Sequence, residues 1–329
     1  MNPIDKLILK SLRKAYQKLF VPAPQPYDRG ITDPDEASKV IYDMLASGKP
    51  CMIARYGAFE LATIVNYLGV TSSHPSAWKF IRGQQPQWWW NRNLMRYMQT
   101  NAGFFPATEE NLSRFCEMML EDSKQLDMLG SWLRDERMML DNLHLSIPRC
   151  SLLLLEPYWA SNPWSRVLEG KKVLVVHPFA PLIEQQYREN RTRLFKDKRV
   201  LPAFELHTLQ AVQSLGGQCE RFTTWFEALD WMKGQMDHTD YDIVLIGCGA
   251  YGFPLAAHAK RTGKQAVHLG GALQLLFGIK GKRWENPEYG ARELSRQNAY
   301  NELTNKYWIR PAESLKPFNA KHVENACYW

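Results

Sequence analysis

The chain has 329 residues, of which 45% are hydrophobic and 23% charged, so it can bury a substantial core without disulfides. Its 41 Lys and Arg residues against 34 Asp and Glu give a net charge of +7, which favours anionic partners such as phosphates or acidic lipids. The basic residues occur in short clusters without a nucleic-acid-binding motif, so we expect no nucleic-acid partner.

Residues 3–20 predict a basic amphipathic helix, because apolar residues recur at helical spacing and five Lys and Arg residues lie largely elsewhere on the wheel. Such a helix can lie on an anionic membrane surface or dock on protein. The cations interrupt any signal-peptide pattern, and the six cysteines are widely spaced. These features predict a cytoplasmic protein that can associate peripherally with the inner face of the cell membrane. The proline-rich residues 21–30 predict a linker that completes an N-terminal region, 1–30.

The pattern of residues 31–75 predicts a strand, a turn and a helix. A helix is expected at about 34–47, a short apolar strand at 51–55, and a second helix from Ala58. Residues 75–150 predict a mainly helical insertion. Within it, the run Trp88-Trp89-Trp90 is a sugar-stacking platform or, more commonly for such residues, a packing element, and we assign no site to it.

The second half of the chain alternates strands with helices. Residues 171–177, 241–247 and 264–270 predict strands buried on two faces, with helices at 181–195 and 254–263. This alternation predicts an α/β fold with a Rossmann-like, doubly wound, mainly parallel sheet, in which residues 31–329 form one domain.

A glycine string, Gly247-x-Gly249-x-x-Gly252, follows a predicted strand and opens a predicted helix. Its backbone amides and the helix dipole suit a diphosphate, although a glycine turn that only packs helix against sheet is the alternative. An NAD site would need an acidic residue at the end of the next strand. His268 and Leu269 stand there, so we expect no NAD.

A second small-residue turn, Gly270-Gly271, leads into a loop with three cations, Lys280, Lys282 and Arg283. Flexible backbone and positive charge suit a diphosphate, and a solvated basic loop is the alternative. His177 ends another predicted strand, at the edge where ligands of α/β sheets bind. Its side chain could contact the donor substrate, and a purely structural role is the alternative.

The first strand delivers an arginine and a carboxylate on either side of a glycine turn: Arg55, Gly57 and Glu60. Glu60 could act as a general base towards an acceptor hydroxyl or as a ligand of a divalent metal. A glutamate in the first turn of a helix also commonly complements the helix dipole.

The segment IARYGAFEL at 53–61 resembles the R-F-G-D-G-E-type segment of GT-D glycosyltransferases found among bacterial glycan-assembly proteins. Segments between PWSRVLEGKKVLVVHPF and the terminal VENACYW look like parts of polysaccharide-biosynthesis proteins related to that class. The resemblance spans about 36–329. It implies a metal-diphosphate bound by an Asp-x-Glu pair, with Mn²⁺ or Mg²⁺. Glu60 matches the glutamate, but Ala58 stands where the aspartate belongs, so the cations of the 280–283 loop are the alternative partners of the diphosphate.

The resemblance implies glycosyl transfer from a UDP-sugar or similar donor to a growing capsule or O-antigen glycan, or to a lipid-linked acceptor. Arg55, Glu60 and His177 would be catalytic, and the glycine loops, His268 and the 280–283 cations would bind the nucleotide sugar. Two alternatives remain. One is an NAD(P)-dependent nucleotide-sugar dehydrogenase or epimerase, and the other is a non-catalytic assembly subunit.

Overall fold

A parallel sheet of seven strands forms the centre of the computed structural model, which describes residues 2–20, 27–214, 216–217, 219–313, 316 and 327–329. The strand order is β3-β2-β1-β7-β6-β4-β5, and every paired strand is parallel. The strands are β1 (Cys51–Ala54), β2 (Met128–Ser131), β3 (Arg149–Ser151), β4 (Lys172–His177), β5 (Glu205–Gln210), β6 (Ile243–Ile246) and β7 (Gln265–His268). The predicted α/β, doubly wound parallel fold is confirmed.

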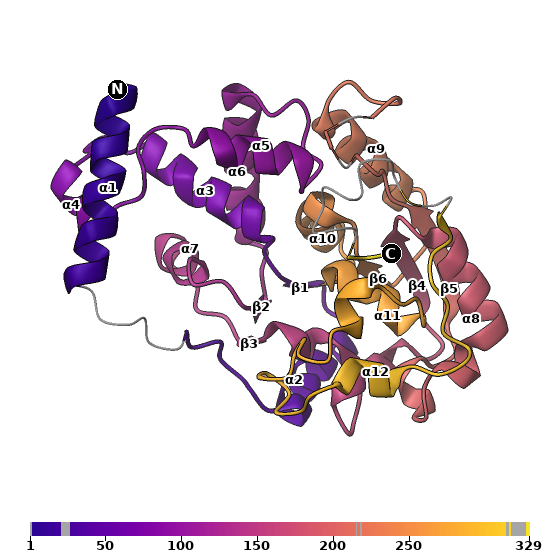
Figure 1. Ribbon diagram of the computed structural model, residues 1–329. Helices are drawn as coiled ribbons and strands as arrows, with labels where there is room; N and C mark the ends of the chain where they lie inside the picture. The colour runs from indigo at the N-terminus through magenta and orange to yellow at the C-terminus, as the bar shows by residue number, and fades with distance from the viewer. Residues whose placement is uncertain (1, 21–26, 215, 218, 314–315, 317–326) are drawn as a thin grey trace.

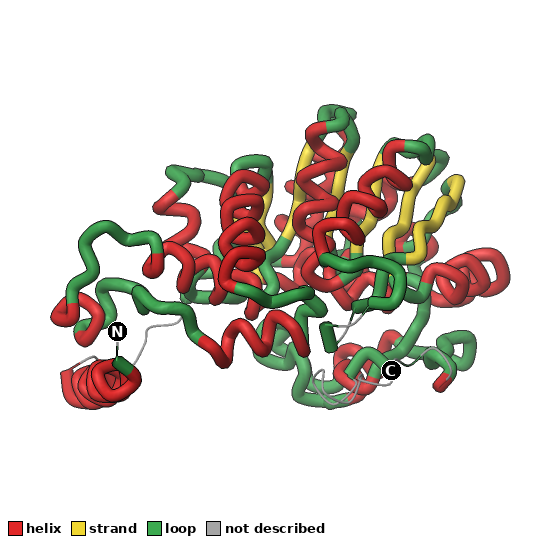
Figure 2. Tube along the Cα trace, turned by 90° about the horizontal axis from the view of Figure 1, so that it is seen from above, coloured by secondary structure: helices red, strands yellow, loops and turns green. Residues whose placement is uncertain are grey.

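Helices cover both faces of the sheet (Figures 1 and 2). Side chains of β4 alternate between two cores, with Leu174 and Val176 in one and Val173 and Val175 in the other. The first core is completed by α3 (Ala58–Val70), α5 (Arg92–Thr100), α6 (Glu109–Ser123), α7 (Glu136–Asn142), α9 (Trp225–Asp237) and α10 (Gly252–Arg261). The second is completed by α2 (Pro34–Ala46), α8 (Ala180–Leu194), α11 (Leu273–Leu276) and α12 (Ala299–Leu303).

The region 75–150 differs from the predicted helical insertion. It contains α4 (Ala77–Ile81), α5, α6 and α7, but it also supplies β2 and β3 to the central sheet. These strands have four and three residues, too few for a periodic pattern to reveal. Their pairing fixes them in place, because Ile53 lies opposite Met128 and Leu129 opposite Arg149. The region is therefore part of the sheet and not only an addition to it.

The tryptophan run contributes to packing. The Trp88 ring lies edge-on to Phe80 at 5.4 Å and to Trp89 at 5.0 Å between ring centroids. The Asn66 side chain donates a hydrogen bond to the Trp89 carbonyl oxygen at 3.0 Å, which holds the run against α3. None of the three tryptophans lines the main cavity described below, so the packing interpretation is supported.

The predicted N-terminal helix is present as α1 (Pro3–Phe20). The Asn2 side chain accepts a hydrogen bond from the Ile4 amide at 3.1 Å, and Pro3 occupies the first helical position, where its missing amide hydrogen is not needed. Figure 1 shows α1 beside α4 at one end of the molecule. Residues 21–26 of the predicted linker lie outside the described part of the chain. No helix in the described ranges combines the length and apolarity needed to cross a bilayer.

Candidate functional site

A cavity of about 220 Å³ opens at the carboxyl edge of the sheet. The strands β4 and β6 are neighbours, but the chain continues from β4 to β5 on one side and from β6 to β7 on the other. Such a switch in direction creates a crevice where ligands of open α/β sheets bind. Residues at or beyond the carboxyl ends of all seven strands line the cavity, including Arg55, Trp132, Glu156, His177, Gln213, Gly249 and His268.

Most of the predicted site residues meet in this cavity. Those that line it are Arg55, Gly57, Glu60, His177, Gly247, Gly249, His268, Gly270, Gly271 and Arg283. Three predicted residues do not line it: Gly252, Lys280 and Lys282. The two glycine turns therefore converge with the Arg-x-Gly-x-x-Glu turn at 55–60, which lies far from both of them in the sequence.

Arg55 leaves β1 at the rim of the cavity and is held by an aromatic partner. Its guanidinium carbon lies 5.0 Å from the centroid of the Trp132 ring. The Trp132 indole donates a hydrogen bond to the Tyr56 carbonyl oxygen at 3.0 Å, which ties the end of β2 to the turn after β1. Trp132 thus orients a cation towards the cavity, where an anion would neutralise it.

Glu60 is buried in the first turn of α3, with its carboxylate folded back over Gly57. A Cβ at Gly57 would lie 1.9 Å from a Glu60 carboxylate oxygen, so the glycine makes room for this arrangement. Burial raises the pKa of Glu60, while a hydrogen bond from its own backbone amide and the charge of Arg55 oppose the rise. The carboxyl group thus complements the helix end and also borders the cavity.

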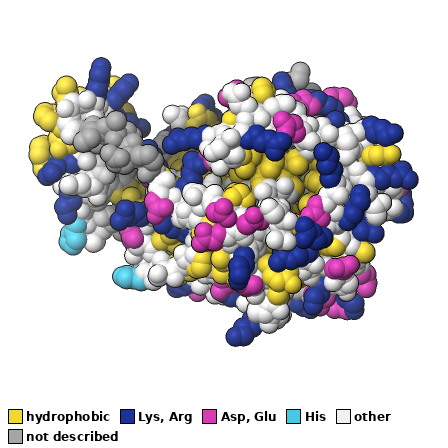
Figure 3. All heavy atoms as spheres, turned by 90° about the horizontal axis from the view of Figure 1, so that it is seen from below, with side chains coloured by type: hydrophobic (Ala, Val, Ile, Leu, Met, Phe, Trp, Pro, Cys, Tyr) yellow, Lys and Arg dark blue, Asp and Glu magenta, His cyan; other side chains and the backbone are white. Residues whose placement is uncertain are grey.

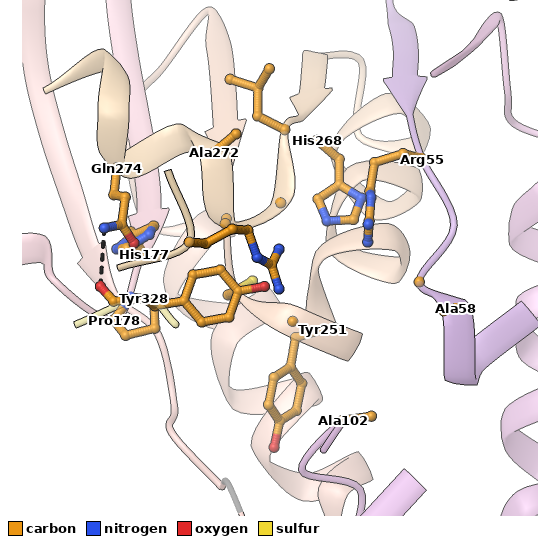
Figure 4. A pocket seen from close by; sticks show the side chains of 18 of the residues that line it. Arg55, Ala58, Ala102, His177, Pro178, Tyr251, His268, Ala272, Gln274 and Tyr328 are labelled. Atoms are coloured by element: carbon orange, nitrogen blue, oxygen red, sulfur yellow. Dashed lines mark hydrogen bonds between the residues drawn. The ribbon is translucent and has the colours of Figure 1, made fainter. Parts of the chain in front are cut away.

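His268 ends β7 with its ring inside the cavity, and Figure 4 shows it next to the Arg55 side chain. Burial and the positive charge of Arg55 lower the pKa of His268 to about 3, so the imidazole is neutral at physiological pH. The Arg55 backbone approaches the ring, but neither ring nitrogen makes a hydrogen bond of normal geometry with a described residue. A buried polar group of this kind is ready to bind a ligand.

Gly252 supports His268 from outside the cavity. A Cβ at Gly252 would lie 2.2 Å from the His268 Nε2 atom, so only glycine allows α10 to begin under this ring. Gly247 has a similar packing role, because its Cβ would lie 2.5 Å from the Gly270 carbonyl oxygen. The packing interpretation of the glycine string therefore holds for its first and last members.

Gly249 differs from the other two glycines of the string. Its φ is +59°, a conformation that L-residues rarely adopt, and an added Cβ would meet open space. The backbone here is open to the cavity and precedes the N-terminus of α10. Of the three glycines, this is the one positioned for close approach by a ligand.

His177 closes the floor of the cavity at the end of β4. Its Nδ1 atom accepts a hydrogen bond from the Phe179 amide at 3.0 Å, so the proton of the neutral ring resides on Nε2. Burial lowers the pKa of His177 to about 3. The histidine can donate a hydrogen bond but does not carry a positive charge at physiological pH.

The predicted cation cluster is divided by the fold. Arg283 lines the main cavity, Lys282 is exposed, and Lys280 lines a small separate pocket near α12. The short 3-10 helix Lys282–Glu285 directs the successive side chains of Lys282 and Arg283 to different sides, which the sequence pattern did not predict. The Arg283 guanidinium carbon lies 4.8 Å from the centroid of the Tyr328 ring.

The C-terminal residues form one wall of the cavity. The Gln274 side chain donates a hydrogen bond to the Tyr328 carbonyl oxygen at 3.1 Å, drawn as a dashed line in Figure 4. The Arg283 amide donates to the Cys327 carbonyl oxygen at 2.9 Å. Gly271 allows the Tyr328 ring to lie directly on the backbone, since an added Cβ would come within 2.1 Å of it. Residues 323–326 of the terminal segment lie outside the described ranges.

Glu156 is a lining residue that the sequence patterns did not identify. It follows the short β3 strand, and its Oε2 atom accepts hydrogen bonds from the Trp159 indole and the Tyr300 hydroxyl, both at 2.8 Å. Burial raises the pKa of Glu156 to about 7. A single acid after the apolar run LLLL was the available signal, but it is too common a pattern to identify a site.

The turn does not fit a metal ion held by protein ligands. Ala58 offers no oxygen, and Glu60 is the one carboxylate of the turn, with its oxygens folded over Gly57. Among the described residues no three His, Cys, Asp or Glu side chains gather in a possible metal cluster. Divalent cations in such sites normally have several oxygen ligands, so the donor set here is incomplete.

Comparisons with known proteins do not identify a function. No family model matches the chain, and no curated protein matches it. One solved structure that aligns is the selenomethionine-substituted structure of a domain of unknown function, DUF1792. It is 12% identical, with a TM-score of 0.34, and the alignment covers 84% of this chain and 99% of that one. The cavity is therefore the main guide to the function of this protein.

Proposed function

We propose that this protein is a glycosyltransferase that moves a sugar from a nucleoside diphosphate sugar to a hydroxyl acceptor. The observation that carries the proposal is the meeting of two arginines, Arg55 and Arg283, with the neutral His268 and the open Gly249 turn in one cavity. Cations and free backbone amides stabilise a diphosphate both when bound and when it leaves. The resemblance of residues 53–61 to GT-D enzymes agrees with this chemistry.

In the proposed reaction, the acceptor oxygen forms a bond to the anomeric carbon while the bond from that carbon to the diphosphate breaks. Arg55 and Arg283 neutralise the charge that develops on the diphosphate. Glu60 takes the proton of the acceptor hydroxyl, and Arg55 favours the ionised form that this role requires. His177 donates a hydrogen bond to the donor substrate through Nε2. No step needs a protein-bound metal.

The finer assignments are UDP as the nucleotide and a surface glycan, of the capsule or O-antigen kind, as the acceptor. They rest on the resemblance of the sequence segments. The dehydrogenase alternative lacks an acidic partner for a ribose, because β7 ends at His268. The non-catalytic alternative predicts nucleotide binding without turnover.

A ligand screen tests the proposal. The melting temperature should rise with at least one of UDP, GDP and CMP, each tried with and without Mn²⁺, and should not change with NAD or NADP. Arg55→Ala and Arg283→Ala should each remove the shift. Arg137→Ala is the matched control, because this side chain is 81% exposed and does not line the cavity. A shift with NADH, or equal shifts in all three variants, would contradict the proposal.

A further inference from the structure

The helix α1 meets the rest of the protein through a mixed face and leaves its apolar face open. Arg13 lies over the Phe80 ring at 4.7 Å and donates a hydrogen bond to the Gln85 carbonyl oxygen at 3.4 Å. The Tyr16 ring lies 6.4 Å from that of Trp78 in α4. No residue of α1 is buried by these contacts.

The open face carries an apolar stripe, which we define as Ile4, Leu7, Ile8, Leu12 and Leu19. These side chains are between 48% and 73% exposed. Their spacing places them on one side of the helix, opposite the face that holds α4. An amphipathic helix that packs on its own protein would normally turn this side inwards. Here the stripe has no covering element among the described residues.

The stripe continues onto α4. Tyr16 lies one turn from both Leu12 and Leu19 on the helix surface, and its ring contacts Trp78, which is 62% exposed. Trp78 is 62 positions away from Tyr16 in the sequence, so only the fold joins it to the stripe. Tryptophan is the residue type enriched where a membrane meets water.

A row of lysines borders the stripe. Lys10, Lys14 and Lys18 recur every fourth residue, are exposed, and form no salt bridge with a described residue. Figure 3 shows hydrophobic and basic side chains gathered at this end of the molecule. If two copies of α1 paired symmetrically, the lysine row of one copy would lie near that of the other and the two would repel each other. Anionic lipid headgroups would instead neutralise the lysine charges.

We propose that α1 and Trp78 form a binding surface for an anionic lipid bilayer, with the apolar stripe inserted among the lipids and the lysine row at the headgroups. The proposal is independent of the reaction in the cavity. Figure 2 shows α1 and the C-terminus, whose residues line the cavity, at the same edge of the molecule. Binding through α1 would therefore bring the cavity to the membrane side, which suits an acceptor attached to lipid.

The test is co-sedimentation of the full-length protein with vesicles of phosphatidylcholine, with and without phosphatidylglycerol. We expect binding to the anionic vesicles, and we expect it to weaken as salt is added. The triple change Lys10→Gln, Lys14→Gln and Lys18→Gln should lower this binding on the order of a hundredfold. The matched control, Lys49→Gln, Lys196→Gln and Lys306→Gln, removes the same charge elsewhere and should lower it far less.

The apolar part is tested with Ile8→Ser and Leu12→Ser together, which should lower binding about tenfold or more. Unchanged circular dichroism melting would show that these variants fold, because α1 buries no side chain. Absence of binding to anionic vesicles, or equal loss in the lysine variant and its control, would overturn the proposal. So would a dimer, measured by light scattering, that the double serine variant converts to a monomer.

Discussion

Glu60 and Glu156 line the same cavity but have different surroundings. Glu60 lies at the N-terminus of α3 with Arg55 nearby, so a helix end and a cation favour its ionised form. Glu156 lies among aromatic side chains and accepts hydrogen bonds from neutral donors, among them Trp159 and Tyr300. Burial raises the pKa of both carboxyl groups. Of the two, only Glu60 has a nearby positive charge, that of Arg55, that opposes the rise.

One cavity thus holds two buried carboxyl groups that differ in what opposes the effect of burial on their pKa. The pKa of Glu156 is raised to about 7, so at neutral pH much of this group keeps its proton and can donate a hydrogen bond. For Glu60, the charge of Arg55 favours the carboxylate, which is the form that accepts a proton. The four predictions below test this division of roles.

The largest effect is expected for Glu60→Gln, which keeps the shape and removes the charge. Turnover with an identified donor and acceptor should fall on the order of 10²-fold or more, because general base catalysis is worth about that much. The melting temperature should change little. Glu156→Gln is the matched control, and its turnover should stay within about tenfold of wild type. If Glu60 only complements the helix, Glu60→Gln should instead show near-normal turnover and lose at most about 1 kcal/mol of stability.

The second prediction concerns the pH dependence of stability. The carboxyl of Glu156 ionises near pH 4.5 in the unfolded chain and near pH 7 in the folded protein, so folding favours the protonated form. The wild type should therefore lose about 3 kcal/mol relative to Glu156→Gln as the pH rises from about 4.5 to above 7. Urea unfolding at several pH values measures this difference. Parallel stability curves would mean that Glu156 is not held in its protonated form.

The third prediction links Arg55 to Glu60. Because the arginine charge favours the carboxylate, Arg55→Met should raise the pKa of Glu60 and move the acidic limb of the pH–rate profile to higher pH. Stopped or continuous assays across the pH range measure the limb. Arg137→Met should leave the limb in place. An unmoved limb in Arg55→Met would separate the arginine from the ionisation of Glu60.

The smallest effect is expected for Ala58→Asp, which restores the carboxylate of the GT-D pattern at the first residue of α3. A negative charge there should add about 0.3–1 kcal/mol of stability through the helix dipole. Together with Glu60 it should also give a rise in melting temperature with Mn²⁺ that exceeds any rise in the wild type. The same response to Mn²⁺ in both proteins would show that the pair cannot act as a metal site.

The sequence by itself was enough to predict the strands β1, β4, β6 and β7, because continuous apolar runs identify strands that are buried on both faces of a parallel sheet. It also indicated which turns would converge, since the carboxyl ends of parallel strands share one edge. The basic helix α1 was equally clear from its periodicity.

Only the tertiary structure decided which side chains reach the cavity. It added β2 and β3 from segments too short to show a period, and it separated Arg283 from Lys280 and Lys282 within one loop. It also brought Glu156 and Tyr328 to the cavity. Local patterns report spacing along the chain, whereas burial, the direction of a side chain and the pKa of Glu156 depend on residues far away in sequence, which only packing brings together.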